Sequence, residues 1–308
     1  MNQALPALVV IGGATAAGKT RLSLELAARI PGAQIISADS RQVYRGMDIG
    51  TAKVGAADRT RVPHHGLDLV DPDEPFTAAD FQAHATAALR AIAAAGGVAI
   101  LVGGTGLYLR SVARGVPLED AGFDPAVRAG LEARLSTGGL GPLVAELRGV
   151  APGVASSIDL ANPRRVVRAL ERVSVTGDRP PPAPRGYPAP IRWLGLDPDR
   201  QDQARAIAER AETQFATGML EEAAALRERY PEDLRAFSAV GYREAFDVLA
   251  GRASLGPAIE RTIQRTRAYA RRQRTWFRSE PGVTWYTGLD AARSDLPSIA
   301  DRVARIRA

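Results

Sequence analysis

Hydrophobic and polar positions in the first third of the chain alternate between two kinds of segment. The runs ALVVI, QII and VAILV, which begin at residues 7, 34 and 98, are short and almost wholly apolar, which is typical of buried parallel strands. Residues 20–30 and 77–95 instead carry apolar side chains at helical spacing, and Thr77 and a Gly-Gly pair mark the ends of the second segment. Strands that alternate with helices predict an α/β core with a parallel sheet.

The pattern changes after residue 111. Short helical segments follow, and no strand is evident until IRWLGL, Ile191 to Leu196, after a proline-rich loop over residues 176–190. The remainder reads as helices over residues 202–230, 241–251 and 257–280, and then as a short strand, GVTWYT. We therefore predict a core built from residues 1–111 and 191–308, and a small all-helical insertion domain over residues 112–190.

A glycine-rich segment joins the first strand to the first helix. In GGATAAGKT, Gly12 to Thr20, the spacing fits the phosphate-binding loop G-x-x-x-x-G-K-[ST], and both flanking elements are of the required kind. Backbone N–H groups and the start of the helix attract an anion, and Lys19 adds a point charge. The Thr20 hydroxyl is placed to reach Mg²⁺. The core is therefore predicted to resemble a P-loop NTPase, the class that also binds ATP.

Composition narrows the range of functions. The chain has 308 residues, 45% of them hydrophobic, and neither a membrane-length apolar run nor a signal-like start, so we expect a cytoplasmic protein without membrane contact. The sequence contains no cysteine, which excludes disulfides, thiolate nucleophiles and Cys-ligated zinc. The formal charge of +6 favours a polyanionic partner. Only two of the forty basic residues are lysine, Lys19 and Lys53.

Three further segments carry candidate chemistry. Asp39 follows the second strand, where a carboxylate can bind Mg²⁺ or accept a proton, although from the residue alone capping of a turn is an equal alternative. GGTGLY places Thr105 and free backbone N–H groups at the end of another strand. Near the C-terminus, Arg267, Arg271, Arg274 and Arg278 recur at helical spacing and form one face. From the spacing alone a solvated face is the simpler interpretation, whereas the nearby aromatic residues and the basic chain suggest contact with a phosphate backbone.

Ten motifs in order over nearly the whole chain resemble the tRNA dimethylallyltransferase family, also called the tRNA isopentenyl-diphosphate transferase family. They are GATAAGKT, DSRQVYRGMDIGTAK, VPHHGLD, ADFQ, LVGGTGLYLR, NPRRVVRALE, GLDPDR, GMLEEAAAL, AVGYRE and TRAYARRQRTWFR. The chain departs from the family pattern at Ala14, usually proline, and at Ala17, often serine. No zinc-finger extension of the eukaryotic kind follows the last motif, so we expect a member of the bacterial type.

The resemblance implies transfer of a dimethylallyl group from dimethylallyl diphosphate to N6 of adenosine 37, beside the anticodon of a tRNA, with release of pyrophosphate. Asp39 is then the base, Thr105 bonds the target adenine, and Mg²⁺ on Thr20 is the cofactor. The diphosphate would be held by Arg210 and by the loop residues Gly13, Ala14, Thr15, Ala16, Ala17, Gly18, Lys19 and Thr20. The implied tRNA contacts are Asp39, Ser40, Arg41, Gln42, Thr105, Arg128, Asn162, Pro163, Arg164, Arg165, Val166, Arg271 and Arg274, and the protein is expected to act as a monomer on the anticodon stem-loop.

Three other functions fit parts of the sequence. A small-molecule kinase would bind ATP in the same loop, but no arginine-bearing lid is evident and the C-terminal helix is unusually basic for one. An RNA-binding protein without prenyl chemistry would bind tRNA and leave its mass unchanged. An enzyme that prenylates free adenine nucleotides would not need the helical insertion or its arginine cluster.

Overall fold

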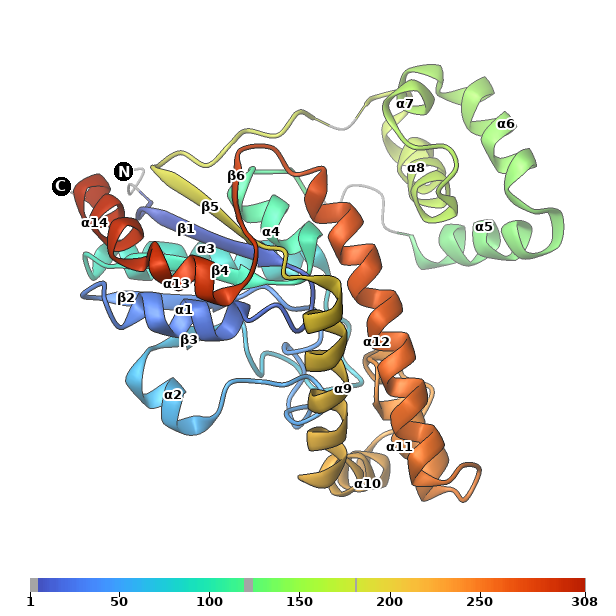
Figure 1. Ribbon diagram of the computed structural model, residues 1–308. Helices are drawn as coiled ribbons and strands as arrows, with labels where there is room; N and C mark the ends of the chain where they lie inside the picture. Colours follow the sequence, from blue (N-terminus) through green and yellow to red (C-terminus); the bar gives the residue numbers. More distant parts are fainter. Residues whose placement is uncertain (1–4, 119–123, 181, 308) are drawn as a thin grey trace. The chain divides into compact units, whose positions relative to one another are not determined.

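The computed structural model describes residues 5–118, 124–180 and 182–307 and divides into two compact units. The core unit comprises Met1–Gly115 and Gly186–Ala308, and the insertion unit comprises Val116–Arg185. Within its described residues the insertion unit contains helices only: α5 (Pro125–Gly138), α6 (Leu140–Val150), α7 (Pro152–Ser157) and α8 (Pro163–Thr176). These helices share an apolar core of their own, so the helical insertion of the predicted fold is present (Figure 1).

The core unit is built on a six-stranded sheet in which every pairing is parallel. The spatial order is β3 (His64–His65), β2 (Ala33–Ser37), β4 (Val98–Gly103), β1 (Leu8–Gly13), β5 (Ile191–Leu196) and β6 (Val283–Tyr286). Both β1 and β4 are buried along their whole length, as their unbroken apolar runs predicted. Because the strands are parallel, the segments that follow β1, β2 and β4 leave the sheet at the same edge.

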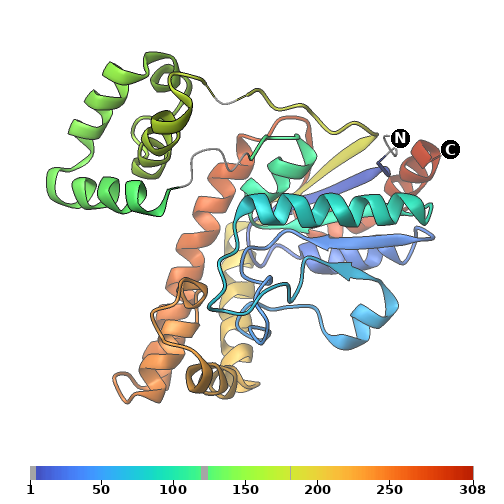
Figure 2. The same ribbon diagram turned by 180° about the vertical axis from the view of Figure 1, so that it is seen from behind.

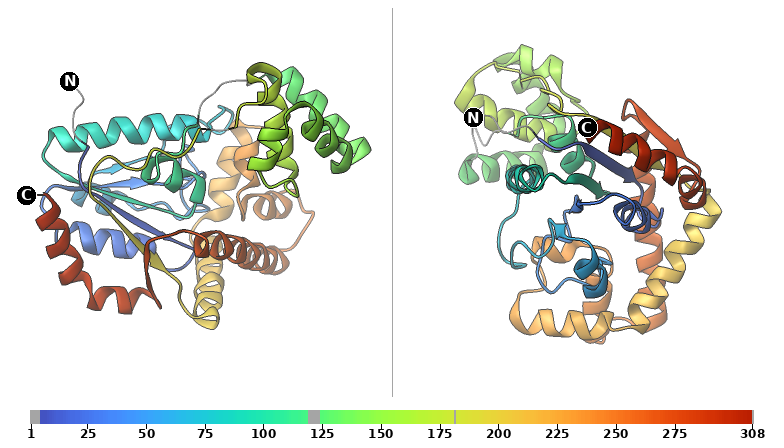
Figure 3. Two further views of the ribbon diagram at one scale, coloured as in Figure 1. Left: turned by 90° about the horizontal axis from the view of Figure 1, so that it is seen from above. Right: turned by 90° about the vertical axis from the view of Figure 1, so that its left-hand side faces the viewer.

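Alternate side chains of each strand pack against different helix layers, as the two-residue period of a strand requires. Leu8 and Val10 join a cluster with α3 (Ala78–Ala94) and α4 (Gly106–Ala113). Val9 and Ile11 join another with α1 (Lys19–Ala27), α13 (Leu289–Ser294) and α14 (Leu296–Arg307). The sheet therefore lies between two helix layers, which can be followed in Figures 2 and 3.

Beyond the carboxyl ends of the strands stand two long helices, α9 (Arg200–Ala216) and α12 (Leu255–Arg278), side by side (Figures 1 and 2). The shorter α10 (Met219–Arg229), the 3₁₀ turn η1 (Arg235–Ser238) and α11 (Tyr242–Leu249) connect them. In the described part of the chain, no helix has both the length and the apolar character needed to cross a bilayer.

The observed elements differ from the predicted ones in three places. The helix expected over residues 202–230 is broken, because Gly218 has φ +118°, a left-handed conformation that favours glycine, and α10 starts anew after it. The connection over residues 41–75 is not plain loop, since it contains α2 (Ala56–Arg61) and β3. After β6 the chain forms two helices, α13 and α14, which the pattern did not predict.

Candidate active site

The loop between β1 and α1 has the backbone of an anion cradle. Gly13 and Gly18 have φ values of +145° and +89°, and Ala16 has +59°. A side chain on Gly13 would also lie within 2.6 Å of the Leu196 carbonyl on the neighbouring strand. The close approach to β5 and the left-handed turns together account for glycine at the first motif position, and they turn backbone N–H groups inward.

The ammonium of Lys19 lies at the mouth of this cradle. Its Nζ donates to the Ala14 carbonyl at 2.7 Å, which draws the charge back over the loop. Burial is the main reason that the pKa of Lys19 falls to about 8; the Asp39 carboxylate opposes this shift, and the nearby Arg210 guanidinium adds to it. The protein therefore holds a cation in a place where water does not fully stabilise it, and an anion bound in the loop would supply the missing stabilisation.

The apex of the loop, Thr15, is held by three side chains from distant helices. Arg210 donates to the Thr15 hydroxyl at 2.6 Å, and Gln203, also on α9, donates to the Thr15 carbonyl at 2.8 Å. From α12, the Gln273 carbonyl oxygen accepts from the Thr15 N–H at 2.8 Å, and its amide nitrogen donates to the Gly104 carbonyl at 2.8 Å. Gln273 thus ties the segments after β1 and β4 together.

Sequence analysis did not identify Gln203 and Gln273 as site residues. Both are nearly buried, at 5% and 6% exposure, in helices rich in charged residues. The available signal was position: Gln273 lies between the apolar residues Ala270 and Phe277, which recur at helical spacing and are both buried, and an amide there needs a polar partner.

Asp39 and Thr105 come from neighbouring strands and meet at the same edge of the sheet. One oxygen of the Asp39 carboxylate accepts from the Arg41 N–H at 2.9 Å, and the Thr105 hydroxyl accepts from the Ser40 N–H at 3.0 Å. The charge of Asp39 acts on Lys19, and together with burial it raises the pKa of Tyr269 to about 12. A carboxylate, a hydroxyl, two cations and the anion cradle therefore lie near one another at the carboxyl edge of the sheet, where α/β proteins bind ligands.

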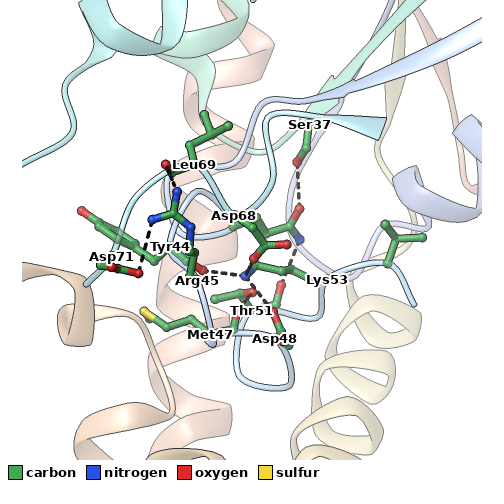
Figure 4. Close-up of polar contacts among 12 residues, drawn as sticks. Ser37, Tyr44, Arg45, Met47, Asp48, Thr51, Lys53, Asp68, Leu69 and Asp71 are labelled. Carbon is green, nitrogen blue, oxygen red and sulfur yellow. Dashed lines mark hydrogen bonds and ion pairs between the residues drawn. The ribbon is translucent and has the colours of Figure 1, made fainter. Parts of the chain in front are cut away.

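The side chains of Arg41 and Gln42 are engaged by the protein itself. Arg41 donates to the Arg235 carbonyl at 2.9 Å and to the Ser238 hydroxyl at 2.8 Å. The Gln42 amide nitrogen donates to the Thr51 carbonyl at 3.0 Å, and its oxygen accepts from the Ser37 hydroxyl at 2.7 Å (Figure 4). These contacts fix the conformation of the loop that follows Asp39.

Four arginines of α12 line one groove with α9, as their spacing predicted. The groove measures about 330 Å³, and its cationic residues are Arg200, Arg267, Arg271, Arg274 and Arg278. Arg274 differs from the others, because its side chain is only 12% exposed and forms an ion pair with Asp197 at 2.7 Å. It also donates to Gln203, the residue that holds the phosphate loop. Arg271 is exposed and available to a polyanion.

The candidates in the insertion unit fall into two groups. Arg164 and Arg165 are exposed in the first turn of α8, where Asn162 caps the helix and Pro163 starts it. Val166 is fully buried in the unit's core, and Arg128 is paired with the buried Glu171 at 2.6 Å. The exposed cations Arg164 and Arg165 are thus carried on a helix whose start is fixed by Asn162 and Pro163.

Among the described residues, no group of three or more His, Cys, Asp or Glu side chains is placed to hold a metal ion. Mg²⁺ in phosphate sites needs only one or two side chains, because the phosphates and water complete its coordination. Thr20 is exposed in the first turn of α1, beside the cradle, and the charge of Asp39 acts on Lys19 of the same loop. This donor set fits an ion that arrives with a diphosphate.

A family model described as IPP transferase matches residues 42–280. The chain belongs to the IPP transferase family. It is 45% identical to a tRNA dimethylallyltransferase of Roseiflexus sp. over 97% of each chain, and 43% identical to one of Nocardioides sp. over 97% of this chain and 95% of the relative. The family and enzyme class predicted from the sequence are confirmed, and the kinase alternative is not favoured.

Solved structures of IPP transferases share the fold. The tRNA isopentenylpyrophosphate transferase of Bacillus halodurans is 38% identical, with a TM-score of 0.71 over 98% of this chain and 96% of that one. A eukaryotic dimethylallyltransferase acting on tRNA, 23% identical, superimposes with a TM-score of 0.79 over 97% of this chain and 78% of its own length. The predicted α/β class with a P-loop-like parallel sheet is confirmed.

Proposed function

We propose that this protein transfers the dimethylallyl group of dimethylallyl diphosphate to N6 of adenosine 37 in tRNA and releases pyrophosphate. One observation carries the proposal: an anion cradle with two partly buried cations lies beside a carboxylate and a hydroxyl at a single edge of the sheet. The cradle and its cations suit a donor with a diphosphate leaving group. The carboxylate and the hydroxyl suit an acceptor that must lose a proton.

On the donor side, the diphosphate occupies the loop Gly13–Thr20. The backbone N–H groups and Lys19 neutralise charge that develops on the leaving oxygen, and Arg210 moves from the Thr15 hydroxyl to the diphosphate as a two-pronged donor. Mg²⁺, bound by Thr20 together with the phosphate oxygens, would neutralise further charge on the leaving group. Because Lys19 and the backbone N–H groups are in place before the donor binds, little reorganisation is needed as the C1–O bond breaks.

On the acceptor side, the N6 amine of adenine attacks C1 of the dimethylallyl group. The new N–C bond forms as the C1–O bond breaks, pyrophosphate leaves with the bonding electron pair, and Asp39 accepts the N6 proton. General-base catalysis of this kind contributes about 10²- to 10⁴-fold. Thr105 hydrogen-bonds the adenine or its immediate surroundings. To reach Asp39 and Thr105, the adenine leaves the anticodon stack, as in other base-modifying enzymes.

We propose two sets of contacts that hold the tRNA. Asp39, Ser40, Arg41 and Gln42 present their loop to the anticodon, and the exposed cations Arg164 and Arg165 of the insertion domain bind its backbone. This surface of the insertion domain also includes, or rests on, four further residues: Arg128, Asn162, Pro163 and Val166. On α12, Arg271 and Arg274 meet the anticodon stem. The protein acts on tRNA as a cytoplasmic monomer.

The test is incubation with unmodified tRNA, dimethylallyl diphosphate and Mg²⁺, followed by nuclease digestion and mass spectrometry. One added C5H8 per modified tRNA, located on the adenosine that follows the anticodon, is the expected result. An unchanged tRNA mass, with ATP consumed in the absence of tRNA, would instead identify a kinase. Binding of tRNA without any mass gain would identify an RNA-binding protein.

A further inference from the structure

Lys53 is one of only two lysines in a chain that carries forty basic residues. The other is Lys19 of the phosphate loop, where a compact point charge suits the ligand. Arginine supplies the positive charge at every other basic position of the chain. A lysine in such a sequence suggests that the geometry of an ammonium group matters at that position. The surroundings of Lys53 show which arrangement of donors is needed there.

The side chain of Lys53 is only 1% exposed, and its Nζ lies among three acceptors (Figure 4). It donates to the Tyr44 carbonyl at 2.5 Å, to the Asp48 carboxylate at 2.7 Å and to the Asp68 carboxylate at 2.5 Å. One nitrogen with three divergent N–H bonds satisfies all three acceptors. A planar guanidinium spreads its donors over three nitrogens and cannot direct them from one point.

These contacts close a ring over residues 42–53, the loop that follows Asp39. Lys53 joins the two ends of the ring, and Gln42 braces it by bonding both the Thr51 carbonyl and the Ser37 hydroxyl on β2. Arg59 donates to the second oxygen of Asp68 at 2.6 Å, so two cations and two carboxylates balance around the buried ammonium of Lys53.

A second anchor holds the far side of the ring. The Glu222 carboxylate on α10 accepts from the consecutive N–H groups of Asp48, Ile49 and Gly50 at 2.8, 2.7 and 3.0 Å. It also accepts from the Tyr242 hydroxyl at 2.6 Å. The far side is therefore fixed to the helical part of the core unit, and Lys53 ties Tyr44, near the start of the loop, to Asp48 on that side.

We infer that Lys53 is a positioning residue for the prenyl transfer, and this rests on the proposed function. Its buried ammonium closes the loop over residues 42–53 and so fixes Asp39 and Ser40 in the geometry that the target adenine requires. Lys53 does not touch the donor site, because none of its three acceptors belongs to the phosphate loop.

The test compares the intact protein with Lys53→Arg, Lys53→Met and a control, Arg45→Lys. Arg45 belongs to the same loop, but its side chain is 50% exposed and pairs with Asp71 at the surface. Titration with dimethylallyl diphosphate in the absence of tRNA counts intact donor sites in each preparation. The single-turnover rate of tRNA prenylation is then expressed per donor site.

Both Lys53 variants are expected to bind the donor within about twofold of the unmodified protein and to lose at least tenfold in single-turnover rate, while Arg45→Lys keeps the rate within about twofold. A Lys53→Arg rate equal to that of the unmodified protein would overturn the inference. Loss of donor binding in parallel with the rate in both variants would also overturn it, in favour of a role in folding alone. If the unmodified protein binds the donor but prenylates no tRNA, the proposed function itself fails, and the inference with it.

Discussion

Replacement of Lys19 by methionine should make the ligand-free protein more stable while it removes donor binding. Methionine keeps the length of the side chain and removes the charge. In the folded protein the pKa of Lys19 is about 8, below its ordinary value of 10.5, and burial is the largest cause. The folded state therefore disfavours the charged lysine at neutral pH, and an uncharged side chain avoids that cost.

The size of the effect follows from the pKa difference. A shift from 10.5 to about 8 corresponds to about 3 kcal/mol at 1.36 kcal/mol per pKa unit. The variant also loses the hydrogen bond to Ala14, worth about 1 kcal/mol, so we expect a net gain of about 2 kcal/mol at pH 7. Between pH 8 and 10.5 the unfolded chain binds more protons than the folded one, so the unmodified protein gains stability as pH rises. The advantage of the variant is thus full below pH 8 and shrinks above it.

Urea denaturation of both proteins at pH 7, 8 and 9.5 measures this difference, and calorimetric titration measures donor binding. The unmodified protein should also bind dimethylallyl diphosphate about tenfold more weakly at pH 9 than at pH 7, because the charged fraction of Lys19 falls by that factor. Arg21→Met, at a side chain 69% exposed on the same helix, is the control and should change neither quantity beyond about 0.5 kcal/mol. A Lys19→Met protein that is less stable at pH 7, or whose advantage does not vary with pH, would refute the reasoning.

Three other predictions concern the base, the packing of the site and the tRNA contacts. Asp39→Asn, which keeps the shape of the side chain, should lower the single-turnover rate by about 10²-fold or more with tRNA affinity within a few fold; a large affinity loss with normal chemistry would contradict the base assignment. Gly104→Ala should cost about 1–3 kcal/mol in urea denaturation, because the added carbon overlaps the buried Gln273 amide, whereas Gly55→Ala, which meets open space, should be neutral; equal effects would contradict the bridge between loops. Arg271→Ala should reduce the slope of log affinity for tRNA against log salt concentration by roughly one. An unchanged slope would show that Arg271 contacts no tRNA phosphate.

Much of the fold followed from local pattern because buried parallel strands leave a strong signal. The runs that became β1 and β4 are unbroken apolar segments, and their ends then placed Lys19 and Thr105 without further information. The break between α9 and α10 was harder, since a single glycine within helical spacing ends a helix in one context and is tolerated in another.

The partners of the site residues could not be read from the sequence. Thr15 and Gln273 are 258 positions apart, and nothing in the local pattern of either one requires the other. Arg41 likewise has a side chain suited to RNA, yet a carbonyl 194 positions away, that of Arg235, engages it. Which acceptor a buried polar side chain finds is decided by tertiary packing, and composition or periodicity does not encode it.

The most direct test is a crystal structure with dimethylallyl thiodiphosphate, an analogue whose sulfur bridge resists loss of the leaving group. We expect the diphosphate in the loop Gly13–Thr20, bound by Lys19 and Arg210, with C1 of the dimethylallyl group facing Asp39. An analogue bound elsewhere, with the loop left vacant, would contradict the proposal that this loop holds a leaving group.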